Sequence, residues 1–242
     1  AAFRDGALAM DRHFETAEPQ RNIPVLKALI DVWNRAGRGL PARCVAAYSS
    51  RLERLPAYLQ QLEMESLGKR VSERGEPLAA PAGGALVWGG RGSDIQHSVF
   101  QWLHQGQEEV PVDFIAVGDV AASGDARARA LLANLAAQSA ALLQGRTGDG
   151  PLGAHKTLPG GRASNILLLP TLDPASLGAL IALHEHKVFT EGWLYGLDPF
   201  DQWGVELGKV LAGDILEGRA GGFDPATRDL IARLDLGPSG SD

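Results

Sequence analysis

Cysteine, long hydrophobic runs and excess positive charge are all scarce in this sequence. The single cysteine, Cys44, excludes a disulfide framework and a zinc site made of thiolates, and it fits a reducing compartment. The longest apolar runs, such as Leu177 to Leu183, are far shorter than the roughly 18 residues that a membrane helix needs. The 23 Lys+Arg are outnumbered by 29 Asp+Glu, which gives a formal net charge of −6. We therefore expect a cytoplasmic protein that binds neither nucleic acid nor a membrane.

Several well-known catalytic fingerprints are also missing. The 242 residues contain no Gly-x-Ser-x-Gly, P-loop or dinucleotide-binding motif, which argues against a hydrolase, a nucleotide triphosphatase and a dehydrogenase. A hydrophobic fraction of 45% and a charged fraction of 21% are ordinary for globular proteins and exclude a disordered or fibrous chain. The length fits one large α/β domain or two small ones.

Short apolar segments alternate with longer segments of helical periodicity. We expect strands over 42–48, 85–88, 112–117 and 165–169. Helices are expected over 3–14, from 23 to a stop at 37–39, and over 52–64, 95–104, 126–143, 174–188, 202–216 and 227–234. Fully apolar strands that alternate with helices predict an α/β protein with a mostly parallel sheet and helices on both faces.

Ligands of such sheets bind at the carboxyl ends of the strands, in the loops that lead into helices. Gly89-Gly-Arg-Gly92 is expected to form such a loop, before the helix that carries His97. Glycines let the backbone approach a ligand, and a helix N-terminus favours an anion. Glycine-rich connections between strand and helix also arise for steric reasons alone, so both interpretations stay open.

A second candidate segment lies at the C-terminal end of the helix expected over 52–64. Gln61 and Glu65 are four residues apart, so they project from one helical face. A carboxylate in this place can serve as a general base. It can equally be an ordinary solvated glutamate, like its neighbour Glu63, and from these residues alone the solvated interpretation is favoured.

The third candidate segment is Phe200-Asp-Gln-Trp-Gly-Val-Glu-Leu-Gly-Lys209. Gln202, Glu206 and Lys209 are expected to share one helical face. Gly204 and Gly208, four residues apart, indicate either a close helix contact or a pocket lined by backbone.

Two further histidines, His184 and His186, lie two residues apart in an expected helix. This spacing places them on different faces and argues against a shared metal site. We expect the segment 184–187 to form a polar surface or interface patch.

Several motifs, taken together and in this order, resemble the phosphoglucose isomerase (glucose-6-phosphate isomerase) family. They are Met64-Glu-Ser-Leu-Gly-Lys69, Gln96-His97, Trp102-Leu-His-Gln-Gly106, Gly161-Arg-Ala-Ser-Asn165, Leu177-Gly-Ala-Leu-Ile-Ala-Leu-His-Glu-His-Lys187 and Gly196-Leu-Asp-Pro-Phe-Asp-Gln-Trp-Gly-Val-Glu-Leu-Gly-Lys209. The resemblance extends from Met10 to about Lys209. It implies a three-layer α-β-α sandwich of the sugar-isomerase (SIS), flavodoxin-like type with additional C-terminal helices.

The resemblance also implies an activity, the interconversion of glucose 6-phosphate and fructose 6-phosphate in glycolysis and gluconeogenesis. Glu65 matches the family's general base, which moves a proton between C1 and C2 through a cis-enediol. His97 and Lys209 match groups that assist ring opening, and Gln61 and Gln202 match glutamines that contact the ligand. His97 is expected to enter the site from the other subunit of a homodimer. The resemblance implies no metal and no organic cofactor.

Two departures from the family pattern shape the expected domain organisation. The segment 89–97 differs from the family's usual Gly-Glu-Pro-Gly-Thr-Asn-Gly-Gln-His, so its shape and sugar contacts are expected to differ. The family's N-terminal SIS half, with a phosphate-binding loop and an arginine, has no match here. We expect a C-terminal half with an SIS domain over 1–196, a helical segment over 197–236 that completes the active site, and a flexible tail over 237–242.

This half alone is expected to show little or no isomerase activity and to need the N-terminal SIS half, in the same or a separate chain, to act on its sugar phosphate. One alternative is a non-catalytic SIS module that binds a sugar phosphate or regulates another protein. Another alternative is a purely structural half that serves dimerisation.

Overall fold

The computed structural model describes residues 1–119 and 124–236 and divides into two units, Ala1–Phe200 and Asp201–Asp242. The expected tail at 237–242 lies outside the described residues. No described helix is long and apolar enough to span a bilayer.

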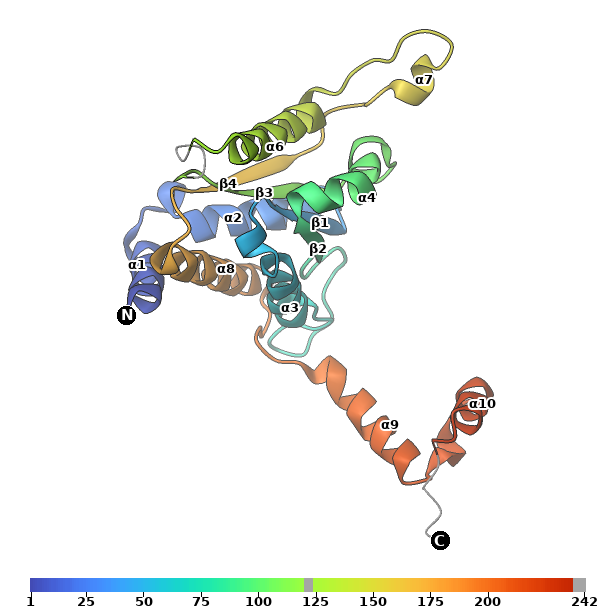
Figure 1. Cartoon of the computed structure of the whole chain (residues 1–242). Helices are drawn as coiled ribbons and strands as arrows, with labels where there is room; N and C mark the ends of the chain where they lie inside the picture. Colours follow the sequence, from blue (N-terminus) through green and yellow to red (C-terminus); the bar gives the residue numbers. More distant parts are fainter. Residues whose placement is uncertain (120–123, 237–242) are drawn as a thin grey trace. The chain divides into compact units, whose positions relative to one another are not determined.

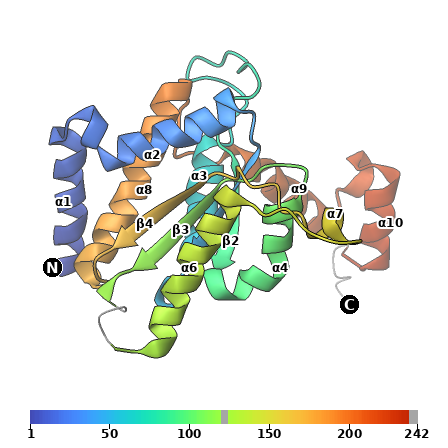
Figure 2. The ribbon, with the colours of Figure 1, turned by 90° about the horizontal axis from the view of Figure 1, so that it is seen from above.

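The first unit is built on a four-stranded parallel sheet with the strand order β2-β1-β3-β4. Figure 2 shows β3 and β4 of this sheet side by side. The strands are β1 (Ala42–Ala47), β2 (Leu86–Arg91), β3 (Val112–Val117) and β4 (Ser164–Leu169). The register pairs Ala46 of β1 with Gly90 of β2 and with Phe114 of β3. All the expected strands are confirmed, and β3 has the expected bounds.

Helices cover both faces of this sheet (Figure 1). The helices of this unit are α1 (Ala2–Thr16), α2 (Ile23–Val32), α3 (Leu55–Leu67), α4 (Gly92–Gln105), α6 (Ala126–Gln144), the single turn α7 (Gly153–Lys156) and α8 (Pro174–Tyr195). Helices α3 and α8 pack on one face, and α4 and α6 pack on the other. The expected three-layer α/β sandwich is therefore confirmed.

Alternation along the strands divides the core into two layers. Cys44 and Ala46 of β1 pack toward α4 and α6, where they meet Phe100. Val45 of β1 faces the opposite layer and packs with Leu59 of α3. Each of these side chains is almost fully buried, and burying a leucine or phenylalanine contributes about 1.5–3 kcal/mol. The central strands β1 and β3 are buried on both faces because helices cover both sides of them.

Local signals set several helix ends. The Asn22 side chain accepts a hydrogen bond from the Val25 amide (3.4 Å), and the Asp173 side chain accepts one from the Ser176 amide (2.7 Å), as N-caps do. Helix α8 continues past the expected end at 188 to Tyr195 and stops at Gly196, whose φ of 64° is left-handed. A turn of π-helix over Trp33–Gly37 extends α2.

The expected loop at Gly89–Gly92 is wrong, because β2 continues through Arg91 and α4 begins at Gly92. Gly89 has a φ of +151°, and an added Cβ there would lie 2.0 Å from the Val45 carbonyl oxygen. A Cβ on Gly92 would lie 2.1 Å from the Tyr48 ring. A side chain at either position would clash with a neighbouring residue, and this explains why both positions are glycine.

The second unit consists of short helices. They are a 3₁₀ turn (Trp203–Val205), α9 (Glu206–Leu216), a second 3₁₀ turn (Ala220–Gly222) and α10 (Pro225–Arg233). The helix expected from 202 starts later, because Gln202, with φ −139° and ψ 45°, is not helical and precedes the first turn. Gln202 therefore does not share a helical face with Lys209, contrary to expectation. An added Cβ on Gly204 or Gly208 would meet no described atom of this unit within 4 Å, so the unit itself gives these glycines no steric role.

Candidate active site

Two of the expected site residues lie together on α3. The Gln61 side-chain amide donates a hydrogen bond to Glu65 Oε2 at 3.4 Å. Lys69 Nζ donates to the Glu65 carbonyl oxygen at 2.9 Å, at the end of the helix where carbonyl groups lack helical partners. Glu65 is half-buried and Gln61 is exposed. The helix therefore presents an amide and a carboxylate side by side at its C-terminal end.

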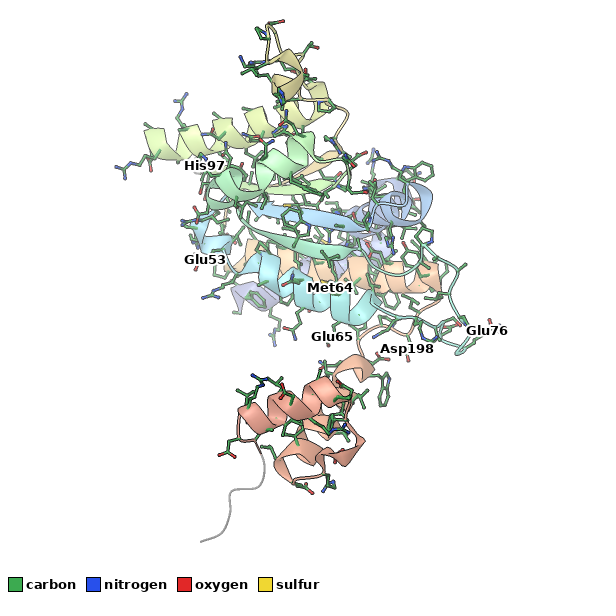
Figure 3. All side chains as sticks on the ribbon, turned by 90° about the vertical axis from the view of Figure 1, so that its right-hand side faces the viewer. Glu53, Met64, Glu65, Glu76, His97 and Asp198 are labelled. Carbon is green, nitrogen blue, oxygen red and sulfur yellow. The ribbon has the colours of Figure 1, made fainter. Side chains whose placement is uncertain are left out.

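His97 lies elsewhere in the same unit, exposed on α4. Helices α3 and α4 pack on opposite faces of the sheet, and Figure 3 shows Glu65 and His97 separated by the strands. The first unit does not bring these two residues together.

Gln202 and Lys209 belong to the second unit. Lys209 lies on α9, with its side chain 66% exposed, and it pairs with Glu206 at 2.8 Å. This is an i,i+3 pair at the surface, where an ion pair contributes little to stability.

The first unit also contains a buried charge cluster that the sequence analysis missed. Its members, contributed by two strands and three helices, are Lys27, Asp31, Arg43, Glu63, Asp113, Lys187 and Glu191. Their pairs are almost fully shielded from solvent. The cluster lies on the side of the sheet that α3 and α8 cover.

Lys187 lies at the centre of this buried charge cluster and is 0% exposed. Its Nζ lies 2.6 Å from Glu63 Oε2 and 2.8 Å from Asp31 Oδ2. A third carboxylate, Glu191, lies 3.0 Å away on the next turn of α8. Lys187 Nζ donates a hydrogen bond to Glu63, and it makes ionic contacts to Asp31 and Glu191.

Arg43 of β1 links the sheet to the helices around it. Its guanidinium group contacts Glu63 on α3 and Asp113 on β3, and it lies 3.6 Å from Asp31 on α2. Lys27 pairs with Asp31 at 2.6 Å and with Asp113 at 3.0 Å. Every ionic group in the cluster therefore has at least one opposite charge in contact.

The carboxylates of the cluster divide by their pKa values. Burial alone raises the pKa of Glu63, but Arg43 and Lys187 outweigh it and bring that pKa down to about 2. Burial raises the pKa of Asp113 too, and Lys27 and Arg43 bring it down to about 2. For Glu191, burial dominates over the attraction of Lys187 and raises the pKa to about 8. Glu191 is therefore the member that holds a proton most readily.

The polar surface patch expected at 184–187 is wrong. His184 is 2% exposed, and burial lowers its pKa to about 3, so the ring is neutral. His186 stacks on Phe14 with ring centroids 4.3 Å apart and contacts Asp11 at 2.8 Å. Both histidines thus take part in packing. No group of three potential metal ligands occurs among the described residues.

A weak sequence signal for the cluster existed. Arg43 and Asp113 are charged residues inside strands that are otherwise apolar. A charge in a strand that is covered on both faces needs a buried partner. Glu63, expected to be solvated like Glu65, is in fact 3% exposed and supplies one such partner.

A parallel sheet covered by helices on both faces, with an amide–carboxylate pair at the end of α3, defines an α/β protein with a candidate acid–base site. A sequence profile of the phosphoglucose isomerase family matches residues 1–231, and the chain belongs to this family. It is 52% identical to a glucose-6-phosphate isomerase of Albidiferax ferrireducens, over 96% of this chain and 45% of that protein. It is 51% identical to a glucose-6-phosphate isomerase of Polaromonas naphthalenivorans, over 97% of this chain and 46% of that protein.

Solved structures show the same relationship. The crystal structure of a glucose-6-phosphate isomerase from Chlamydia trachomatis superposes with a TM-score of 0.84 and 39% identity, covering 97% of this chain and 46% of that one. The crystal structure of a hypothetical protein, TT0462, of Thermus thermophilus superposes with a TM-score of 0.71 and 26% identity, covering 90% of this chain and 50% of that one. The chain therefore spans about half the length of the relatives it matches.

Proposed function

We propose that this chain is the part of a glucose-6-phosphate isomerase that carries the catalytic base, and that the whole protein interconverts glucose 6-phosphate and fructose 6-phosphate in the cytoplasm. The observation that carries the proposal is the Gln61–Glu65 pair on α3, in a chain of the phosphoglucose isomerase family.

Glu65 is the general base. Its carboxylate takes the proton from C2 of the open-chain aldose, the electron pair forms the C1–C2 double bond, and the carbonyl oxygen gains a proton to complete the cis-enediol. Return of a proton to C1, with loss of the proton from the C2 hydroxyl, gives the ketose. Gln61 supports this role because its amide donates to one carboxylate oxygen and restricts its orientation.

His97 and Lys209 assist ring opening, and Gln202 contacts the sugar. The separation of α3 and α4 by the sheet favours a site that takes Glu65 from one subunit and His97 from another. A homodimer meets this requirement, because a two-fold axis gives each site one copy of both residues.

The rest of the active site comes from the N-terminal SIS half, which binds the phosphate and stabilises the enediolate. The chain covers only 45% of the Albidiferax ferrireducens protein, which leaves room for such a half. Trp33 is 65% exposed and Trp193 is 74% exposed in the first unit. Large exposed apolar side chains are typical of a surface that another domain covers.

A coupled assay of fructose 6-phosphate isomerisation tests the proposal. The 242-residue chain alone should show little turnover, and supplying the N-terminal half should restore it. In the restored protein, Glu65→Gln should abolish turnover, while the exposed control Glu76→Gln should leave it unchanged. Rapid turnover by the isolated chain contradicts the half-site proposal.

Calorimetry with fructose 6-phosphate distinguishes the proposed enzyme from the alternative, a non-catalytic module that binds a sugar phosphate. Heat of binding without turnover in the restored protein would support that alternative. A stable dimer with neither binding nor turnover would instead indicate a structural half.

A further inference from the structure

Helix α3 has two functionally different faces. Residues two apart on a helix point about 200° apart, because each residue turns the chain by about 100°. Gln61 and Glu65 therefore project from one face, and Glu63, which lies between them, projects from the opposite face into the buried charge cluster. The candidate base and the buried anchor belong to the same turn of helix.

Glu63 ties that turn to two other elements. Its Oε2 contacts the guanidinium group of Arg43 on β1 and lies 2.6 Å from Lys187 Nζ on α8. The other anchors of α3 are apolar side chains such as Leu59, which is 0% exposed, and two neutral donors. Gln60 Nε2 donates to the Val87 carbonyl oxygen on β2 at 2.9 Å, and the Tyr58 hydroxyl lies 3.4 Å from Glu185 on α8. Apolar contacts are non-directional, whereas charge-assisted hydrogen bonds have a defined geometry. Glu63 therefore makes the buried charged contact that restricts rotation of α3 about its own axis.

The effect of a small rotation at the site is large. An atom near the surface of a helix lies about 5–6 Å from the axis, so a rotation of about 10° moves it by about 1 Å. A misplacement of about 1 Å in a catalytic group can lower the rate by about 100-fold.

We propose that Glu63 is a positioning residue, which directs the Glu65 carboxylate by locking the rotation of α3 onto Arg43 and Lys187. This inference rests on the proposed role of Glu65. It assigns to the buried ion pairs an effect on the reaction in addition to any effect on stability.

Glu63→Asp is the informative substitution, because it keeps the charge and shortens the side chain by one methylene. Restoring the contacts to Arg43 and Lys187 then requires α3 to move or rotate. Glu191→Gln is the matched control: Glu191 is equally buried and also contacts Lys187, but it lies on α8 and is not part of α3. Both variants alter the cluster, and only one alters the anchor of the helix that carries Glu65.

The kinetic test uses the complete enzyme, with the N-terminal half supplied. We expect Glu63→Asp to lower kcat by about 10- to 100-fold with KM changed little, whereas Glu191→Gln keeps the wild-type kcat. Wild-type kcat in Glu63→Asp, in a protein that Glu65→Gln inactivates, overturns the proposal. A protein that Glu65→Gln does not inactivate shows instead that the proposed function has failed.

A second measurement is independent of turnover. Crystal structures of the 242-residue chain and its Glu63→Asp variant, superposed on the sheet, should show the Glu65 carboxylate displaced by about 1 Å. An unchanged carboxylate position overturns the positioning role whatever the kinetics show. If Glu63→Asp fails to crystallise, hydrogen exchange of the α3 amides, compared between Glu63→Asp and Glu191→Gln, serves as the structural readout. Faster exchange in Glu63→Asp alone is expected, and equal exchange in the two variants overturns the proposal.

Discussion

Glu191 should make the folded protein less stable as the pH rises from neutral to weakly alkaline. The buried charge cluster has three cations, Lys27, Arg43 and Lys187, and four carboxylates, so it would carry 3 − 4 = −1 if every group were charged. An uncompensated buried charge is costly. Within the cluster, the described contacts of Glu191 reach one cation, Lys187, whereas Asp31 contacts all three. Glu191 is therefore the member expected to stay protonated.

The groups that face Glu191 are Lys187 and Tyr195 on the same helix, Asp31 on α2, Glu63 on α3 and Arg43 on β1. Burial is the largest cause that raises its pKa from 4.5 to about 8; Asp31 and Glu63 add to the rise, whereas Lys187 and Arg43 oppose it. Between these values the folded state binds a proton that the unfolded state releases, so the free energy of unfolding falls as the pH rises. The fall is about 1.4 kcal/mol per pH unit and ends near pH 8.

His184 opposes this effect over part of the range. Burial lowers its pKa from 6.5 to about 3, so the unfolded state binds the additional proton between these values, and stability rises with pH up to 6.5. The two effects cancel between pH 4.5 and 6.5. The free energy of unfolding therefore falls only from about pH 6.5 to pH 8, by about 2 kcal/mol in total at about 1.4 kcal/mol per pH unit.

Urea unfolding at closely spaced pH values from 6 to about 9 measures this loss. We expect the free energy of unfolding of the wild-type chain to fall by about 2 kcal/mol, and that of Glu191→Gln to stay nearly constant. Glu185→Gln, an exposed change on the same helix, should follow the wild type. A wild-type curve that is flat between pH 6.5 and 8, or an equal slope in Glu191→Gln, refutes the assignment of the proton to Glu191.

Three further predictions concern stability. In the folded protein the pKa values of Glu63 and Asp113 are lowered to about 2, so below about pH 4.5 the unfolded state binds more protons than the folded state. The free energy of unfolding should therefore fall as the pH drops toward 2, and circular dichroism would detect the loss of folded protein. Lys187→Met should cost about 3–5 kcal/mol in urea unfolding, because it leaves buried carboxylates without their shared cation, and a cost under about 1 kcal/mol would contradict this. Gly89→Ala should lower the melting temperature, because its Cβ would clash with a neighbouring strand, whereas Gly213→Ala in the open interior of α9 should stabilise by up to about 1 kcal/mol; equal melting temperatures would contradict the clash.

Most of the layered fold could be predicted because its signals are local. The strand at 112–117 has the expected bounds, since an apolar run between turn residues identifies a buried strand. The helix expected from 23 starts there, because its N-cap Asn22 depends only on neighbouring backbone groups. The stop of α8 at Gly196 is not among the expectations, which end this helix at 188. The expected loop at 89–92 is wrong because a glycine run fits both a loop and a strand that passes close to its neighbour, and only the position of β1 distinguishes them.

The candidate site was predictable in part. The spacing of Gln61 and Glu65 predicts a shared helical face, and their hydrogen bond confirms it. The opposite environments of Glu63 and Glu65 were not predictable, because the α3 pattern does not show which polar residue meets a buried cation. The burial of His184 was missed for the same reason.

The sequence by itself determined the alternation of strands and helices, the helix caps and the motifs that place the chain in its family, because each depends on residues close together along the chain. The tertiary structure alone decided which charges are buried together. Lys187 and Glu63 are far apart in sequence yet lie 2.6 Å apart between α8 and α3. Their partners Arg43 and Asp113 come from neighbouring strands. Such a cluster forms because a buried charge must find an opposite charge, and only the folded layers bring those charges within contact distance.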